Sequence, residues 1–261
     1  GMLRVGIPAY RLPDDILDYE IGIIEEQGVE ILTDKTISGA PSALLQEGFD
    51  AVFVGVGTHE GRRLGVEGDD LEGVVSGIDF LKEMEVSGKK KNFKGKKVAV
   101  IGGGNTAMDC CRTSMRCGAD KVYVIYRRTE KEMPANPIEI HESKLEGIEY
   151  LLLTNPVKIN KDKNGKVKSV TCLKMELGEP DASGRRRPVP IPGSEFELDV
   201  DYVLAAIGQK TDVNFTDDMN KAVKKGELKL NRWGDIDADP KTLQTGVENV
   251  FAAGDGVTGP A

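Results

Sequence analysis

The stretch "KVAVIGGGNTAMDCCRTSMRCGADKVYVIYRR", residues 97–128, decides the fold of this chain. An apolar strand over residues 97–104 runs into three glycines, a helix follows from about residue 105 to 117, and a second apolar strand covers residues 120–128. A glycine-rich turn between a buried strand and a helix is typical of a nucleotide-binding βαβ unit. The stretch therefore predicts an α/β fold with a parallel sheet.

The spacing of the small residues assigns each of them a role. Gly102, Gly104 and Ala107 fit the pattern G-x-G-x-x-A. Gly102 permits a tight turn, Gly104 lets the backbone approach a pyrophosphate, and Ala107 lets the helix pack against the strand. Unpaired N–H groups and a partial positive charge at the start of the helix attract phosphates. We therefore expect a dinucleotide to bind at a continuous set of residues, namely Gly102, Gly103, Gly104, Asn105 and Thr106.

Three polar residues stand in the first turns of the helix behind this loop. Asn105 or Thr106 is placed to cap the helix or to touch a phosphate. Asp109 lies one turn further on, where a carboxylate complements the helix dipole. We count Asp109 with the cofactor-binding residues and keep the dipole role as the simpler alternative.

The end of the second strand discriminates between cofactors. Units that bind NAD usually place an acidic side chain there, about 20 residues after the glycines, to hold the ribose 2′-hydroxyl. This chain has Arg127 and Arg128 instead, and the nearest carboxylate is Glu130. Guanidinium groups form charge-assisted bonds to a 2′-phosphate, each contributing about 1.5–3 kcal/mol. The pair predicts NADPH rather than NADH, with two solvated surface arginines as the alternative.

Composition excludes several classes of partner. The 261 residues carry a net charge of −8, which argues against nucleic acid as a partner. No apolar run reaches the roughly 18 residues that a membrane span needs, and no secretory leader opens the sequence. The four cysteines lack Cys-x-x-Cys and zinc spacings. We therefore expect buried free thiols, no metal site and a cytoplasmic location.

The rest of the chain divides around the central unit. Before it, the patterns predict a helix over residues 13–27, strands over residues 29–34 and 50–58, and a helix that Ser76 caps. Residues 87–97 include six lysines, which we interpret as a solvated connection rather than a docking patch for anions.

Further patterns complete the central unit. They predict a helix near residues 137–146, a strand over residues 149–155, a long hairpin that turns at Asn164 and Gly165, and a buried strand over residues 196–209. We therefore expect one unit inserted between the two parts of another, with domains over residues 1–92, 93–209 and 210–261.

Six motifs in a fixed order carry a resemblance to a known family. They are "GIPAYRLP", "GVGTHEGRRLGVEG", the glycine-to-arginine stretch that ends at residue 128, "EMPA", "AAIGQ" and "VFAAGDGVTGPA". Together they resemble the small (β) subunit of NADPH-dependent glutamate synthase and the wider group that includes the amino-terminal half of dihydropyrimidine dehydrogenase. The resemblance covers essentially the whole chain. It implies a two-dinucleotide-binding flavoprotein fold, with a central Rossmann-like NADPH domain inserted in a partial FAD-binding domain.

The resemblance also assigns residues to the two cofactors. On the NADPH side, the glycine loop corresponds to the pyrophosphate loop of the family, and Arg127 and Arg128 correspond to its 2′-phosphate clamp. Ala206 and Gly208 are expected near the same cofactor, where small residues allow close backbone approach.

On the flavin side, the expected contacts come from both ends of the chain. Gly254 and Asp255 match a Gly-Asp pair whose carboxylate binds the ribityl chain of FAD. The helix that faces the flavin ring is expected to begin at Thr258 and Gly259. The remaining expected flavin contacts are Gly57 and Thr58.

The resemblance implies an enzyme in which NADPH reduces FAD by hydride transfer. Electrons then pass singly to iron–sulfur clusters and to a partner, which is the large subunit in glutamate synthase. The cofactors carry this chemistry, so no catalytic side chain is assigned. Related flavoproteins that feed ferredoxin, sulfide or a pyrimidine, and a non-catalytic NADPH-binding module, are the alternatives. A disulfide reductase of the thioredoxin reductase type needs a Cys-x-x-Cys, which this sequence lacks.

The sequence departs from the family pattern before "GIPAYRLP". The cluster-ligating cysteines and the glycine-rich loop for the FAD pyrophosphate, which precede this motif in the family, are absent. We therefore expect a fragment, cut before Gly1 and after Ala261, that binds NADPH but little or no FAD. Iron–sulfur clusters are expected only in the missing region. An unpaired edge of the flavin sheet favours pairing between copies, so a homo-oligomer is a further alternative.

Overall fold

The structure is a computed structural model that describes residues 1–37, 39–87, 91–181, 184–212, 221, 223 and 228–260. The chain separates into two compact units. Unit 1 comprises Gly1–Leu17 and Gly61–Gly208, and unit 2 comprises Asp18–Glu60 and Gln209–Ala261. Unit 2 is thus made of two segments that flank most of unit 1 in the sequence.

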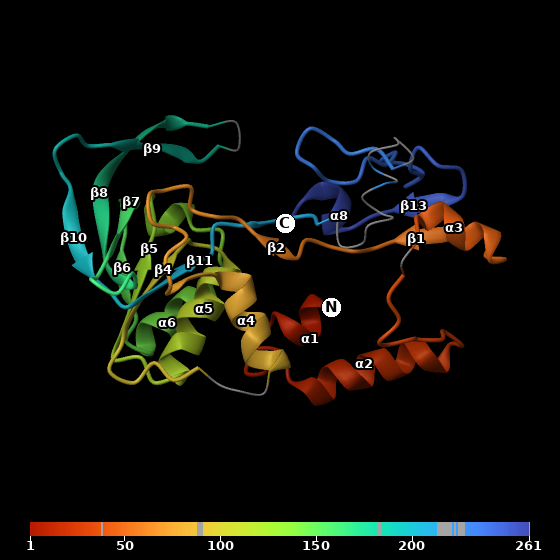
Figure 1. The fold of residues 1–261 in the computed structure, drawn as a ribbon, viewed down its shortest axis with the longest axis horizontal. Helices are drawn as coiled ribbons and strands as arrows, with labels where there is room; N and C mark the ends of the chain where they lie inside the picture. The colour runs from red at the N-terminus through yellow and green to blue at the C-terminus, as the bar shows by residue number, and fades with distance from the viewer. Residues whose placement is uncertain are drawn as a thin grey trace. The chain divides into compact units, whose positions relative to one another are not determined.

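A parallel sheet forms the centre of unit 1 (Figure 1). Its strands follow the spatial order β3, β11, β4, β5, β6, and every neighbouring pair is parallel. The strands are β3 (Val74–Ser76), β4 (Lys97–Ile101), β5 (Lys121–Ile125), β6 (Glu149–Leu151) and β11 (Tyr202–Ala205). The helices that follow strands are α4 (Gly77–Val86), α5 (Asn105–Arg116) and α6 (Pro137–Leu145). The predicted parallel α/β fold is confirmed, and Ser76 caps α4 by accepting the Asp79 N–H at 3.5 Å.

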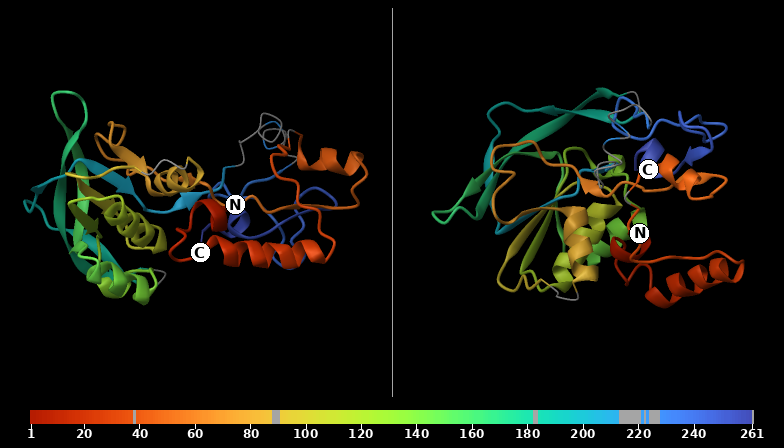
Figure 2. Two further views of the ribbon diagram at one scale, coloured as in Figure 1. Left: turned by 90° about the horizontal axis from the view of Figure 1, so that it is seen from below. Right: turned by 45° about the vertical axis from the view of Figure 1, so that its right-hand side comes forward.

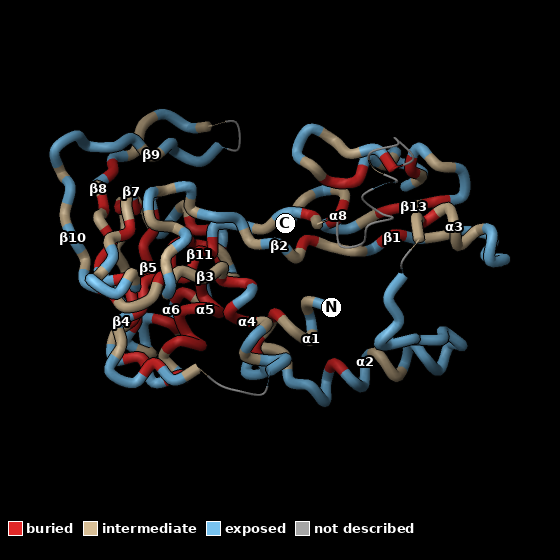
Figure 3. The backbone as a smooth tube through the Cα atoms, in the orientation of Figure 1, coloured by how far each residue is buried: buried red, intermediate tan, exposed pale blue. Residues whose placement is uncertain are grey.

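The parallel sheet is buried on both faces, and Figure 3 marks buried residues along β5 and along the helix α5. Successive side chains of a strand point to opposite faces, so alternate residues enter different cores. The core shared with the helices includes Val98, Val100, Val122 and Val124. The core on the other face includes Ala99, Ile101, Tyr123 and Ile125. This double burial explains why both strands read as continuous apolar runs.

An antiparallel sheet packs on the face that the helices leave open. β7 (Thr154–Lys161) and β8 (Val167–Pro180) form the long hairpin drawn in green to teal in Figure 2, and β9 (Arg186–Pro190) and β10 (Phe196–Asp199) both pair with β8. The hairpin turns at Asn164 and Gly165 as predicted, with a φ of 81° at Gly165.

The single strand expected over residues 196–209 is wrong. β10 belongs to the antiparallel sheet and β11 to the parallel sheet. Between them the Asp201 carboxylate accepts the Lys97 N–H at 2.9 Å and the Lys96 ammonium at 3.0 Å. These bonds hold the bend at Asp201 beside the start of β4, and the chain passes from the antiparallel to the parallel sheet at this bend.

Unit 2 contains a two-stranded parallel sheet of β1 (Val52–Val54) and β13 (Val250–Ala252), with the helices α3 (Pro41–Gln46) and α8 (Asp255–Thr258). The parallel strand expected within residues 50–58 is present but short, and it is only partly buried, because Val54 is 7% exposed and Phe53 is 63% exposed. The strand expected over residues 29–34 is wrong as well. That segment pairs with no described strand, and strand backbone needs a partner for its N–H and C=O groups. The core of unit 2 consists of Val54, Leu228, Ile236, Val250 and Ala252.

The remaining described elements are short, apart from α2 (Asp14–Glu26), which confirms the helix expected over residues 13–27. They are α1 (Met2–Val5), β2 (Glu60–Gly61), the 3₁₀ helix η1 (Glu130–Glu132) and β12 (Gln209–Lys210), which pairs with β2. Within the described ranges, no helix combines the length and the apolar character that a membrane crossing requires. The cofactor-domain boundaries after residues 92 and 209 stay a prediction. Lys89 and Lys90 of the lysine-rich connection lie outside the described residues.

Candidate nucleotide-binding site

The first two glycines of the loop form a close-packed turn at the carboxyl end of β4. Gly102 has a φ of 144°, and a Cβ atom on it would lie 2.1 Å from the Ala206 carbonyl oxygen. A Cβ atom on Gly103 would lie 2.7 Å from the Tyr126 ring. Neither position has room for a side chain, so both glycines are required by the packing.

Gly104 stands in a different environment from its two neighbours. A Cβ atom on Gly104 would meet no atom closer than Cγ of Pro134, at 3.9 Å. Gly104 is also the N-cap residue of α5, and no side chain of the described residues caps this helix. The first N–H groups of α5 therefore lack intrahelical partners and can donate to an anion. This open approach beside a helix N-terminus fits a pyrophosphate.

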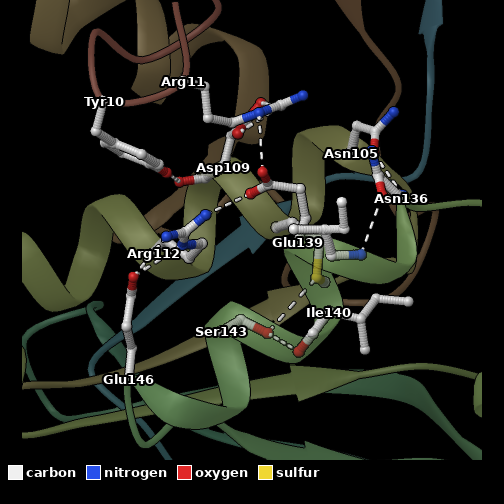
Figure 4. A network of polar contacts seen from close by, with 12 residues as sticks. Tyr10, Arg11, Asn105, Asp109, Arg112, Asn136, Glu139, Ile140, Ser143 and Glu146 are labelled. Carbon is white, nitrogen blue, oxygen red and sulfur yellow. Dashed lines mark hydrogen bonds and ion pairs between the residues drawn. The ribbon is translucent and has the colours of Figure 1, made fainter.

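A neighbouring loop orients the Asn105 side chain (Figure 4). Asn105 Oδ1 accepts the Asn136 N–H at 2.9 Å, which leaves the Nδ2 hydrogens as donors. The Ala135 N–H donates to the Gly103 carbonyl at 3.1 Å, so the loop after η1 forms one wall of the glycine turn. Sequence reasoning missed Asn136, because Asn before Pro signals a helix start and not a site. Thr106 is partly buried, and its hydroxyl bonds to no described residue.

Ala206 lies against the glycine turn, and its expected place near the cofactor stays a prediction. Its N–H donates to the Ile101 carbonyl at 2.8 Å, and its own carbonyl occupies the space beside Gly102. Gly208 follows with a φ of 107°, is exposed, and accepts the Arg62 N–H at 3.1 Å. The structure thus places the end of β11 next to the loop that follows β4.

The two arginines after β5 lie in different environments. Arg127 is exposed and forms no hydrogen bond or ion pair with any described residue. Arg128 is 6% exposed, and its guanidinium donates to the Asp181 carboxylate and to the Arg186 carbonyl. The sequence predicts that the two side chains act together as one clamp, but in the structure they have different contacts.

Asp109 faces the amino-terminal segment of unit 1 (Figure 4). The Arg11 guanidinium donates to both of its carboxylate oxygens at 2.8 Å, and Asp109 is only 4% exposed. Burial raises the pKa of the Asp109 carboxyl to about 6, and the bonds from Arg11 oppose that rise. Asp109 therefore anchors residues before α2 to α5, and its carboxylate is already committed to an ion pair.

Arg11 and Asp109 belong to a longer charged network on α5 and α6. Arg112 donates to Glu139 at 2.5 Å and to Glu146 at 2.7 Å, and it lies 4.9 Å from the Tyr10 ring centre. Desolvation raises the pKa of the Tyr10 hydroxyl, and the nearby Asp109 carboxylate raises it further. No local pattern in the sequence marks this network, since Tyr10 and Arg11 are about 100 residues from the helix that they contact.

The residues expected on the flavin side all lie in unit 2. Thr58 is 2% exposed, and its Oγ1 has no partner among the described residues. A buried hydroxyl without a partner fits a polar ligand group. Gly57 has a φ of 68°, and a Cβ atom on Gly256 of α8 would lie 3.5 Å from the Gly57 nitrogen. The first turn of α8 thus packs on the turn after β1.

The acidic end of the expected flavin site is exposed. Gly254 has a φ of 75° and precedes α8, and the Asp255 carboxylate bonds to no described residue. The expectation that Thr258 and Gly259 begin a helix is wrong. α8 begins at Asp255 and ends at Thr258, because Gly259 takes a φ of 75° and turns the chain out of the helix.

A strand, a glycine turn with no room for side chains and an uncapped helix define unit 1 as a dinucleotide-binding unit of the Rossmann type. A sequence model of the pyridine nucleotide-disulphide oxidoreductase family matches residues 12–261. The chain belongs to this family of oxidoreductases.

Several curated proteins are similar to the chain along almost its whole length. It is 45% identical to the β subunit of the NADP(+)-dependent formate dehydrogenase of Moorella thermoacetica, over 99% of this chain and 36% of that protein. It is 42% identical to the β subunit of the NADPH-Fe(3+) oxidoreductase of Geobacter sulfurreducens, over 100% and 41%. It is 36% identical to the glutamate synthase (NADPH) small chain of Escherichia coli (strain K12), over 99% and 56%. The resemblance expected from the motifs is confirmed, and the chain spans between about a third and somewhat more than half of these relatives.

Solved structures with the same fold confirm the expected architecture. FprA of Mycobacterium tuberculosis in complex with NADPH aligns with a TM-score of 0.77 at 18% identity, over 100% of this chain and 70% of that one. Thioredoxin reductase of T. acidophilum aligns with a TM-score of 0.58 at 23% identity, over 80% and 58%. The two-dinucleotide-binding flavoprotein fold predicted from the motifs is therefore the fold of this chain.

Proposed function

We propose that the chain is the NADPH-binding part of a flavoprotein oxidoreductase subunit that passes electrons from NADPH through FAD to iron–sulfur centres and a partner subunit. The observation that carries the proposal is the loop at the start of α5. Gly102 and Gly103 have no room for side chains, whereas Gly104 opens toward the uncapped helix N-terminus. The names of three relatives, from three different organisms, include NADP(+) or NADPH, which supports the same cofactor here.

The residues of the loop would bind the NADP(H) phosphates, and the residues after β5 would select the 2′-phosphate. The N–H groups of the first turn of α5 and the Asn105 amide donate to the pyrophosphate, and Arg127 and Arg128 supply positive charge. Gly57, Thr58, Gly254, Asp255 and Thr258 are the proposed flavin contacts. When both cofactors are bound, hydride transfer is chemistry that they supply themselves.

The relatives support two candidates for the electron acceptor of the whole protein. The motif resemblance favours a glutamate synthase small subunit, whose partner is the glutamate synthase large subunit and whose product is glutamate. The second candidate is a subunit that serves another acceptor. A specific observation favours it, because the relatives named for formate dehydrogenase and for Fe(3+) reduction are 45% and 42% identical, against 36% for the glutamate synthase chain. We propose a cytoplasmic location, in keeping with four buried thiols.

Cofactor binding tests the proposal directly. Isothermal titration of the chain with NADP⁺ and NAD⁺ is expected to show a preference for NADP⁺. The double variant R127A/R128A is expected to lower that preference about ten- to a hundredfold, because charge-assisted bonds to the 2′-phosphate are lost. The matched control K161A/K163A removes the same charge from the β7–β8 turn and is expected to leave the preference unchanged. An unchanged preference in the arginine variant would contradict the proposal.

Electron transfer separates an enzyme from a binding module. NADPH-dependent reduction of a dye is measured with and without added FAD. Reduction that depends on added FAD supports an oxidoreductase whose flavin contacts lie partly in this chain. NADPH binding without dye reduction under both conditions supports the alternative of a non-catalytic NADPH-binding module.

A further inference from the structure

Asp109 lies one helical turn behind Asn105 on the same face of α5. Residues four apart on a helix are neighbours, with Cβ atoms about 5–6 Å apart. Helix side chains also tilt toward the amino-terminal end, which brings a carboxylate at residue 109 nearer to the turn proposed to bind the pyrophosphate. A negative charge at this place repels an anion and opposes the partial positive charge of the helix N-terminus.

The Arg11 guanidinium balances this charge (Figure 4). Its Nη1 donates to both Asp109 oxygens at 2.8 Å, and its Nε lies 3.5 Å from Glu139 Oε1. The side chains of Asp109 and Arg11 are 6% and 22% exposed, so solvent ions screen the pair only weakly. A second cation near Asp109 is Arg112, but it donates to the carboxylates of Glu139 and Glu146. The charge of Asp109 is therefore balanced chiefly by Arg11.

Tyr10 fixes the segment before α2 in this position. Its ring centre lies 4.9 Å from Arg112 Cζ and 4.0 Å from Arg116 Cζ, both on α5. The Tyr10 hydroxyl donates to the Asp109 carbonyl oxygen at 3.5 Å. Two neighbouring side chains thus hold this segment against α5, so Arg11 presents its charge without the cost of ordering a loose chain.

We propose that Arg11 strengthens dinucleotide binding without contacting the dinucleotide, by balancing the charge of Asp109 behind the glycine turn. This inference rests on the proposed NADPH function and adds a residue that acts through another one. NADP⁺ and NAD⁺ carry the same pyrophosphate, so the affinity for both must change by the same factor. The cofactor affinity of unit 1 then depends on the segment that precedes α2.

A double-mutant cycle at pH 9 tests the charge balance. Dissociation constants of NADP⁺ and NAD⁺ are measured by isothermal titration for the unchanged chain, R11M, D109N and R11M/D109N. R11M is expected to weaken the binding of both cofactors about tenfold, because one carboxylate close to the site stays unbalanced. D109N is expected to strengthen both about threefold, and the double variant to return to within about threefold of the unchanged chain.

Rescue separates the charge effect from structural damage. R11K keeps the positive charge on a different side chain, and it is expected to bind both cofactors within about threefold of the unchanged chain. A loss in R11M that D109N does not restore would overturn the inference. A loss confined to NADP⁺ would overturn it as well, because the pyrophosphate is common to both cofactors.

The pH profile gives an independent readout. Burial raises the pKa of the Asp109 carboxyl to about 6, and the bonds from Arg11 oppose that rise. Removing Arg11 raises this pKa further, so residue 109 of R11M is neutral at pH 5.5 and charged at pH 9. The dissociation constant of R11M divided by that of R11M/D109N is expected to fall from about tenfold at pH 9 to less than about twofold at pH 5.5. An equal ratio at both pH values would contradict the charge effect.

Neighbouring groups leave this profile undisturbed. The other titratable groups beside Asp109 include the Tyr10 hydroxyl and the thiols of Cys110 and Cys111. Burial raises the pKa of all three, so they stay neutral from pH 5.5 to 9. Titration of the cofactor itself cancels in the ratio, since both variants bind the same ligand.

The matched control is R4M. Arg4 belongs to the same segment and donates to Asp14 at 2.8 Å, but the two side chains are 38% and 62% exposed. R4M removes the same charge as R11M from a solvated pair, and it is expected to change both dissociation constants less than about twofold. A loss as large as that of R11M would show an effect of total charge and would overturn the local balance.

D109N and R11K keep the test decisive if R11M fails to fold, because both retain a cation at residue 11. Stronger binding by D109N supports the inference, and weaker binding overturns it. Absence of NADP⁺ binding by the unchanged chain would refute the proposed function. Binding by the unchanged chain that R11M leaves the same at pH 9 would refute this inference alone.

Discussion

The two units build their parallel sheets to different degrees of completion. In unit 1, five parallel strands pack between helices and an antiparallel sheet, and Val98 and Val122 are fully buried. In unit 2, the parallel sheet has two described strands, and Phe53 in the middle of β1 is exposed. Parallel strands are normally covered on both faces. The nucleotide loop of unit 1 therefore stands on a complete core, whereas the described part of unit 2 leaves its sheet partly open.

The glycines at the two candidate sites show what this difference does. A Cβ atom on Gly102 would lie 2.1 Å from a carbonyl oxygen, whereas a Cβ atom on Gly254 would meet no atom of the described residues within 4 Å. Both glycines take a positive φ, but packing fixes only the first. A Gly-containing turn after a strand thus becomes a defined binding surface only where neighbouring backbone encloses it.

Matched phenylalanine substitutions test the comparison with the largest expected effect. Phe93 is 1% exposed and packs on Phe80 and Tyr202, with ring centres 5.8 and 4.8 Å away. F93A is expected to lower the free energy of unfolding by about 3–5 kcal/mol. F53A is expected to cost about 0.5 kcal/mol or less, because Phe53 is largely in solvent. Urea unfolding followed by circular dichroism measures both, and a cost above 2 kcal/mol for F53A would show that β1 is covered in solution.

Substitutions in the glycine loop separate packing from binding. G102A places a Cβ atom against the Ala206 carbonyl at an unfavourable φ, and is expected to cost at least about 2 kcal/mol of stability. G104A meets no close atom, so its stability is expected to change by less than about 1 kcal/mol while NADP⁺ affinity falls at least about tenfold. Urea unfolding and isothermal titration give the two readouts. Equal stability losses in the two variants would contradict the assigned difference.

The Asp109 carboxyl makes the stability of unit 1 depend on pH. Among the described groups of unit 2, none has a shifted pKa near 6. The pKa of the folded Asp109 carboxyl, about 6, lies above its ordinary value of 3.8. Folding therefore favours the protonated form, and stability from this group is present below about pH 4 and lost as pH rises through 6. The loss amounts to roughly 3 kcal/mol between pH 4 and 7, because the pKa of this carboxyl is about 6 in the folded chain and 3.8 ordinarily.

Urea midpoints at pH 4, 5, 6 and 7 test this sign. As pH rises, the unchanged chain is expected to lose stability relative to D109N. D70N is the control, because Asp70 is exposed and bonds to no described residue. R11M is expected to steepen the dependence, since it leaves the buried carboxylate without its partner. A flat difference across these pH values would contradict the burial effect at Asp109.

Much of unit 1 could be predicted because its signals are local. The strand, glycine turn and helix of residues 97–117 follow from apolar runs and steric rules that act within a few residues. The turn at Gly165 and the cap at Ser76 follow in the same way. The strands expected over residues 29–34 and 196–209 failed because apolar composition predicts a strand but does not supply its partner or its sheet.

The candidate site shows the same distinction between local sequence signals and contacts of distant residues. Spacing predicted the glycine turn between β4 and α5, since a Rossmann-type turn has one workable order of small residues. It did not show that Asp109 is committed to Arg11, or that Arg128 is committed to Asp181. Both ion pairs join residues that are far apart in the chain, so they depend on the fold and not on any neighbouring pattern.

By itself the sequence determined the fold class, the glycine turn after β4 and the charge that follows β5, because these depend on residue types at short, fixed separations. Only the tertiary structure decided which of the two arginines pairs with a carboxylate among the described residues. Arg127 and Arg128 are neighbours with the same chemistry, yet one meets solvent and the other meets a carboxylate 53 residues away. Burial and partners decide the availability of a charge, and both are properties of the packed chain.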